Sequence, residues 1–140
     1  MNESKIKHLE LIQGVINRLA GNSFLLKGWT VTLTAALFVF SAQGADLTFA
    51  LIAPFSALMF WGLDAYYLWQ ERLYRLLYNE VAIESEITLV TVPPFSLDIT
   101  KYKKQCSTWF VTLWSPTIFS LHGMNLLVVV IVISVKLFLL

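Results

Sequence analysis

Residues 28–63 read GWTVTLTAALFVFSAQGADLTFALIAPFSALMFWGL, and in this stretch only Asp46 carries a charge. About 20 helical residues cross the roughly 30 Å of hydrocarbon in a bilayer, so runs of this length are candidates for membrane-spanning helices. The uncharged run 28–45 and the second run, 47–63, are separated by a short segment of small residues that predicts a tight turn. We therefore expect a transmembrane helical hairpin over residues 23–68.

A third apolar run covers residues 105–135, which contain no Asp, Glu, Lys or Arg. It is longer than one span requires, and Ser115-Pro116 divides it because proline does not continue a preceding helix. We expect a third transmembrane helix over residues 115–140. The alternative is that the last apolar residues, 126–140, only dip into the membrane.

The composition of the 140-residue chain also favours a membrane protein. Hydrophobic residues make up 57% and charged residues 14%, and the mean hydropathy is +0.68. A soluble domain carries about 25% charged residues because it must wet its whole surface. The predicted class is thus an all-α membrane protein, and the formal net charge of +1 gives no reason to expect a nucleic-acid partner.

Amphipathic segments flank the hairpin. In residues 1–22 the apolar side chains recur at three- and four-residue spacing, which predicts an amphipathic helix: Ile6, Leu9, Ile12, Val15, Ile16 and Leu19. This helix either packs on its own protein or lies on the membrane surface, or else pairs with a partner protein or a second copy. Residues 69–114 predict a helix that leaves the membrane, followed near residues 87–92 by a β-branched run that suits a short strand or an extended loop.

The positive residues indicate the orientation. Four Lys or Arg precede residue 28 and five lie between residues 72 and 104, whereas the hairpin turn has none. Cytoplasmic segments carry the excess of Lys and Arg, so we place the N-terminus and the middle segment in the cytoplasm. The basic surface of that segment is formed by Lys101, Lys103 and Lys104. Residues 42–44 resemble a signal-peptide cleavage site, but the 27 residues before the apolar run are unlike a short basic leader.

Asp64 ends the second apolar run and Lys27 precedes the first. Both helices rise equally per residue from the turn, so residues whose numbers sum to roughly 91 should lie level across the hairpin. This predicts an ion pair between Lys27 and Asp64 and brings Trp29 close to Trp61. The pair either sets the register of the hairpin or contains a carboxylate that handles ions or protons. Aromatic side chains suit the headgroup level on either side: Trp29, Trp61, Tyr66, Tyr67, Trp69, Trp109 and Trp114.

No arrangement in the sequence points to catalysis. His8 and His122 fall on segments predicted to face different environments, and neither has a Cys, Asp or Glu at metal-ligand spacing. The single cysteine, Cys106, has no histidine beside it to activate a nucleophile. We therefore expect a protein that is not an enzyme and needs no metal or cofactor.

Four blocks of the sequence resemble a family of small, mostly uncharacterised bacterial membrane proteins: residues 22–29, 60–78, 94–98 and 115–117. Some members are associated with anti-phage defence systems. The resemblance implies a toxic effector that permeabilises the inner membrane when triggered. It carries no catalytic motif.

Three functions follow as hypotheses. The first is a membrane-disrupting effector that acts by helix oligomerisation, with the lipid bilayer as its target. The second is a non-enzymatic accessory or structural subunit of a membrane complex. The third, a small membrane transporter or enzyme, is disfavoured by the few polar groups within the predicted spans.

Overall fold

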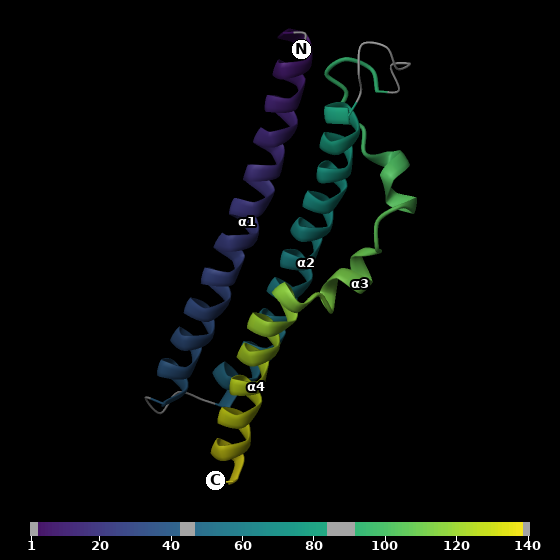
Figure 1. The fold of residues 1–140 in the computed structure, drawn as a ribbon. Helices are drawn as coiled ribbons and strands as arrows, with labels where there is room; N and C mark the ends of the chain where they lie inside the picture. Colours follow the sequence, from purple (N-terminus) through teal and green to yellow (C-terminus); the bar gives the residue numbers. More distant parts are fainter. Residues whose placement is uncertain (1–2, 43–46, 84–91, 139–140) are drawn as a thin grey trace.

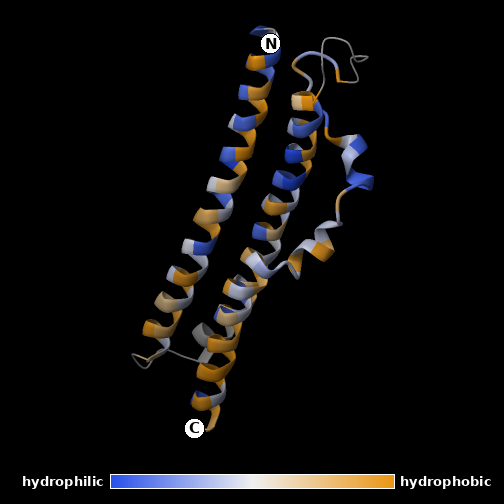
Figure 2. Ribbon diagram, in the orientation of Figure 1, coloured by the Kyte–Doolittle hydropathy of each residue, from blue (hydrophilic) through white to orange (hydrophobic). Residues whose placement is uncertain are grey.

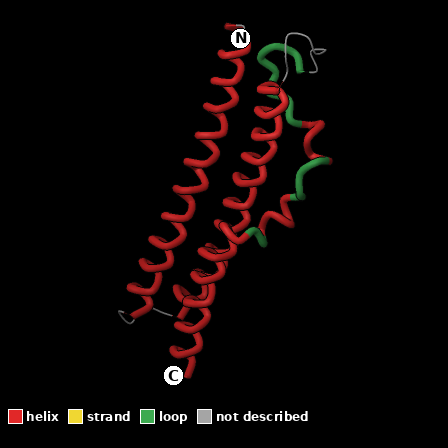
Figure 3. The backbone as a smooth tube through the Cα atoms, in the orientation of Figure 1, coloured by secondary structure: helices red, strands yellow, loops and turns green. Residues whose placement is uncertain are grey.

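The computed structural model describes residues 3–42, 47–83 and 92–138, with residues 47–51 described as backbone only. All regular structure in this part of the chain is helical (Figure 3), which confirms the predicted all-α class. The elements are α1 (Glu3–Ala42), α2 (Leu47–Ile83), the short 3₁₀ helix η1 (Thr100–Lys104), α3 (Trp109–Leu113) and α4 (Pro116–Phe138). Most of the run proposed as a strand or loop, residues 87–91, lies outside the described residues.

Helices α1 and α2 form a long antiparallel pair, and α4 lies beside their lower half, running in the same direction as α1 (Figure 1). Each helix of the pair is longer than the segments predicted for it. The expected boundaries at residues 22/23 and 68/69 fall inside α1 and α2, which pass through them unbroken. No proline interrupts residues 3–42, so nothing in that sequence forces the predicted amphipathic helix to end before the apolar run begins.

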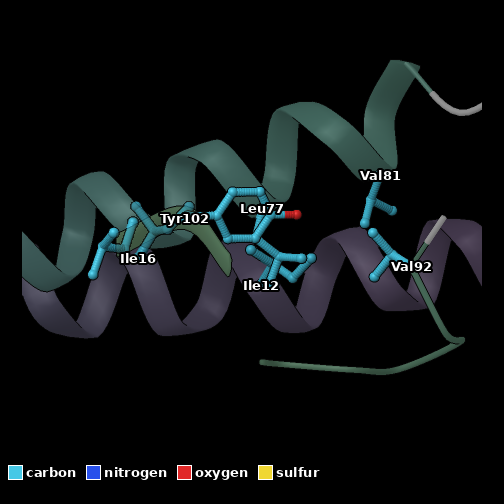
Figure 4. Packing of buried hydrophobic residues seen from close by; sticks show 7 residues of the cluster. Ile12, Ile16, Leu77, Val81, Val92 and Tyr102 are labelled. Atoms are coloured by element: carbon cyan, nitrogen blue, oxygen red, sulfur yellow. The ribbon is translucent and has the colours of Figure 1, made fainter. Parts of the chain in front are cut away.

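The upper half of the bundle has an apolar core, which we call the head core. Two α1 residues, Ile12 and Ile16, pack there against α2, and residues after α2 cover them (Figure 4). Its buried members are Ile12, Ile16, Leu73, Leu77, Val81, Val92 and Tyr102. The amphipathic face predicted for residues 1–22 is therefore used within the chain itself, against α2.

η1 is held on this core through Tyr102 and its neighbour. The Tyr102 hydroxyl donates to Glu80 Oε2 at 2.6 Å, and Lys101 Nζ lies 2.6 Å from Glu80 Oε1. Burial and the hydrogen bond to the Glu80 carboxylate raise the pKa of Tyr102 to about 12. The same carboxylate raises the pKa of Lys101. The predicted basic surface is thus only partly free, because Lys101 is paired while Lys103 and Lys104 lie exposed.

The lower half of the bundle is rich in apolar residues (Figure 2), many of them exposed on its outside. Two helices, α1 and α4, are long and apolar enough to cross a membrane by length and composition. Large hydrophobic side chains of both are more than half exposed, among them Val39 and Phe40 on α1 and Ile131 and Leu137 on α4. α4 begins at Pro116, where the sequence predicted the third apolar helix to start. The span expected over residues 47–63 forms the first part of α2, and it stays a prediction, as does the insertion of α1 and α4 in a membrane.

Candidate functional site: a buried polar cluster between the long helices

Asp64 is the centre of the candidate site. Its side chain is fully buried, although α2 is otherwise apolar along this stretch. Burying an ionised carboxylate is costly unless charge partners and hydrogen-bond donors surround it. Here donors reach it from both of the other long helices, so α1, α2 and α4 meet at one side chain.

From α1, Lys27 and Ser23 reach the carboxylate. Lys27 Nζ lies 2.7 Å from Asp64 Oδ2 and 2.9 Å from Oδ1, and the Ser23 hydroxyl donates to Oδ1. Lys27 Nζ is also 2.7 Å from Ser23 Oγ, four residues earlier on the same helix face. The structure therefore brings together the two residues that the hairpin register placed level with each other.

From α4, His122 completes the cluster. Its Nε2 lies 2.8 Å from Asp64 Oδ2, and its side chain is 1% exposed. Spacing along the sequence did not predict this contact, because Asp64 and His122 are 58 positions apart. The sequence feature that could have predicted a polar partner for His122 is its position within an apolar run. Ionisable residues at such positions generally face a polar partner inside the bundle. His8, by contrast, lies in the upper half, with Nε2 2.8 Å from the Ser96 carbonyl oxygen.

The indole of Trp61 covers the imidazole of His122. The ring centroids are 6.3 Å apart and the planes are nearly parallel, at 8°. Trp61 also contacts the rings of Trp114 and Phe119. Trp29 is 61% exposed, and its expected proximity to Trp61 stays a prediction. On this side His122 is thus bordered by Trp61 of α2, which packs in turn against Trp114 and Phe119.

Two tryptophan hydrogen bonds fix the α3 segment beside the cluster. Trp61 Nε1 donates to the Leu113 carbonyl at 3.0 Å, and Trp109 Nε1 donates to the Gly62 carbonyl at 3.1 Å. Arg72 adds a third link through the Ser115 hydroxyl, at 3.0 Å. The other predicted interface aromatics, Tyr66, Tyr67 and Trp69, form a ring cluster one to two turns further along α2.

Below the Asp64 cluster, two more polar contacts join α1 to α4. Asn125 Nδ2 donates to Thr34 Oγ1 at 3.2 Å, and Lys136 Nζ donates to the carbonyl and the hydroxyl of Ser41, both at 2.6 Å. The α1 positions 27, 34 and 41 are seven residues apart, so they face the same side of the helix at intervals of about 10 Å. We call this line of contacts the polar seam; its members are Ser23, Lys27, Thr34, Ser41, Asp64, His122, Asn125 and Lys136.

The seam is flanked by open space. A groove of about 510 Å³ lies at the Thr34–Asn125 contact, lined mostly by apolar side chains of α1 and α4. A second, of about 380 Å³, lies at the Ser41–Lys136 contact. Below the Asp64 cluster, α1 and α4 are thus joined by polar contacts beside open grooves.

Among the described residues no group of three or more His, Cys, Asp or Glu side chains could hold a metal ion. The free thiol of Cys106 is half-buried between η1 and α3.

No protein-family model, no curated protein and no solved structure matches this chain. The resemblance drawn from residues 22–29, 60–78, 94–98 and 115–117 therefore stays a prediction.

Proposed function

We propose that this chain is a non-enzymatic protein of the bacterial inner membrane that makes the bilayer permeable, with α1, the first part of α2 and α4 as its spanning helices. The observation that carries the proposal is the polar seam. Hydrocarbon cannot hydrogen-bond, so polar side chains in a spanning bundle face one another or a water-filled space. The seam extends from His122 to Lys136, about 21 Å of the roughly 30 Å of a bilayer core.

Assembly of several copies is the step that would turn the seam into a path. In one copy the seam residues of α1 are hydrogen-bonded to partners on α2 or α4. The grooves beside Thr34 and Ser41, however, open sideways between α1 and α4. Neighbouring copies that cover these grooves exclude lipid from the seam and allow water in. This assembly fits the anti-phage effector function that the sequence resemblance implies.

Replacing the middle contact of the seam tests the proposal. With purified protein in liposomes, or in cells loaded with a membrane-potential dye, we expect the wild type to cause depolarisation. The double variant Thr34→Val/Asn125→Leu should slow it several-fold, because it makes this level of the seam apolar at similar volume.

Ser134→Ala is the matched control for this variant. Ser134 lies exposed on α4, and its hydroxyl donates to the Val130 carbonyl of its own helix at 2.8 Å, so depolarisation should persist. A membrane-inserted wild type without any effect on the potential would refute the proposal. It would favour the alternative of an accessory subunit, whose partner should then co-purify.

The orientation is tested with the single native cysteine. We expect Cys106 to be cytoplasmic, so a membrane-impermeant maleimide should label it in inverted vesicles and leave it unlabelled in intact spheroplasts. In a Cys106→Ser background, Ala42→Cys at the end of α1 should show the opposite pattern, because the hairpin turn is placed outside. Labelling of both cysteines from the same side would contradict the hairpin as a transmembrane unit.

A further inference from the structure

His122 has one feature that the packing of the bundle does not require. One ring nitrogen, Nε2, is engaged by Asp64, while the other, Nδ1, is buried without a hydrogen-bond partner. Buried polar atoms are nearly always paired, so an unpaired one calls for an explanation. Nδ1 of a neutral imidazole whose Nε2 donates to a carboxylate is an acceptor with a free lone pair.

The charges around this ring are few. Lys27 of α1 and Asp64 of α2 face it, α3 contributes no titratable side chain, and Arg72 is directed toward Ser115. The Lys27 ammonium and the Asp64 carboxylate balance each other, so a neutral His122 leaves the cluster uncharged. A proton added to Nδ1 gives the cluster one positive charge. That charge lies on the imidazolium ring, beside the Asp64 carboxylate to which the ring is already bonded.

We propose that the permeant species is the proton and that the His122–Asp64 pair is its binding site within the polar seam; this rests on the permeability proposed above. A hydronium ion that arrives through the seam gives its proton to Nδ1 and leaves as water. The imidazolium then gives up the Nδ1 proton to a second water molecule, which carries it onward, and this restores the neutral ring with Nε2–H still bonded to Asp64. No electron is transferred, and Asp64 keeps the ring oriented through Nε2.

The rest of the seam suits a proton better than a larger ion. A metal cation or an anion would have to exchange its hydration shell for a few widely spaced groups between apolar walls. A proton needs only water molecules between hydrogen-bonding groups. The groove of about 510 Å³ at Thr34 and Asn125 exceeds the roughly 30 Å³ that one water occupies in the liquid, so it has room for several.

The two histidines of the chain provide a matched pair of variants. Liposomes that contain the purified protein, an internal pH dye, and valinomycin with potassium to clamp the potential report proton flux. We expect His122→Gln to lower that flux by about tenfold or more, because glutamine keeps a hydrogen bond to Asp64 but cannot take up a proton. His8→Gln, in the upper half, should leave the flux unchanged. Trapped carboxyfluorescein should be retained throughout.

A measurement on the wild type does not depend on how the variant folds. Flux through a site that holds one proton at a time levels off once the site is always occupied, here tested by lowering the external pH from about 8 to about 5. A wild-type flux that keeps rising in proportion to proton concentration over that range would overturn the proton site, as would a full flux in folded His122→Gln. Leakage of carboxyfluorescein that does not depend on His122 would overturn it too, but would leave the permeability proposal standing. An inserted protein that passes neither protons nor dye would refute both.

Discussion

Asp64→Ala is expected to destabilise the bundle by about 3–5 kcal/mol, the range for removing one partner of a buried ion pair. The substitution leaves Lys27 and His122 without the group that binds them, and it removes the only described side chain that accepts hydrogen bonds from both α1 and α4. The cost falls toward the lower end of this range if the Lys27 side chain extends to the membrane surface. The measurement is equilibrium unfolding in detergent micelles, followed by far-UV circular dichroism.

A double variant separates the charge effect from the loss of packing. In Lys27→Met/Asp64→Leu neither charge is buried alone, and an apolar pair of similar volume is often as stable as the ion pair it replaces. We expect it to regain most of the stability lost in Asp64→Ala. Asp98→Ala is the surface control, because Asp98 lies exposed before η1 and bonds only locally, to the Thr100 backbone N–H among its described contacts. Equal stability of Asp64→Ala and wild type would show that the cluster contributes nothing to the fold.

Leu77→Ala is expected to cost about 2–5 kcal/mol, the range for truncating a fully buried leucine. Leu77 is completely buried in the head core, where α1 and α2 pack beneath Val92 and Tyr102. The loss combines the transfer free energy of the removed carbons with the cavity they leave, which a core of two helices and one covering segment can close only in part. Chemical unfolding of the whole chain measures it.

The control for Leu77→Ala is the same substitution at an exposed site. Leu11 is 49% exposed on α1, one residue before Ile12 of the head core, so Leu11→Ala should change the unfolding free energy far less. Similar losses for the two variants would mean that α1 does not dock on α2 as described.

The helical class and the pairing of Lys27 with Asp64 could be derived from the chain alone. The class depends on the lengths of uncharged runs, and the pairing depends on a short turn between two helices of equal rise. The helix ends were harder to predict. A change from amphipathic to apolar sequence near residue 22 reads as a boundary, yet the backbone hydrogen bonds of α1 continue through it, because helix formation responds to local propensity and not to the solvent outside.

What the sequence by itself determined is therefore local: where helices form, which residues are apolar, and which residues lie level across one tight turn. Only the tertiary structure decided that α4 lies along α1, with His122 at Asp64, Asn125 at Thr34 and Lys136 at Ser41. These partners are separated by 58 to 95 positions, across segments that no constant rise per residue connects. Their meeting depends on how Trp61, Trp109 and Arg72 anchor the segment before α4, and that is a property of the packed bundle.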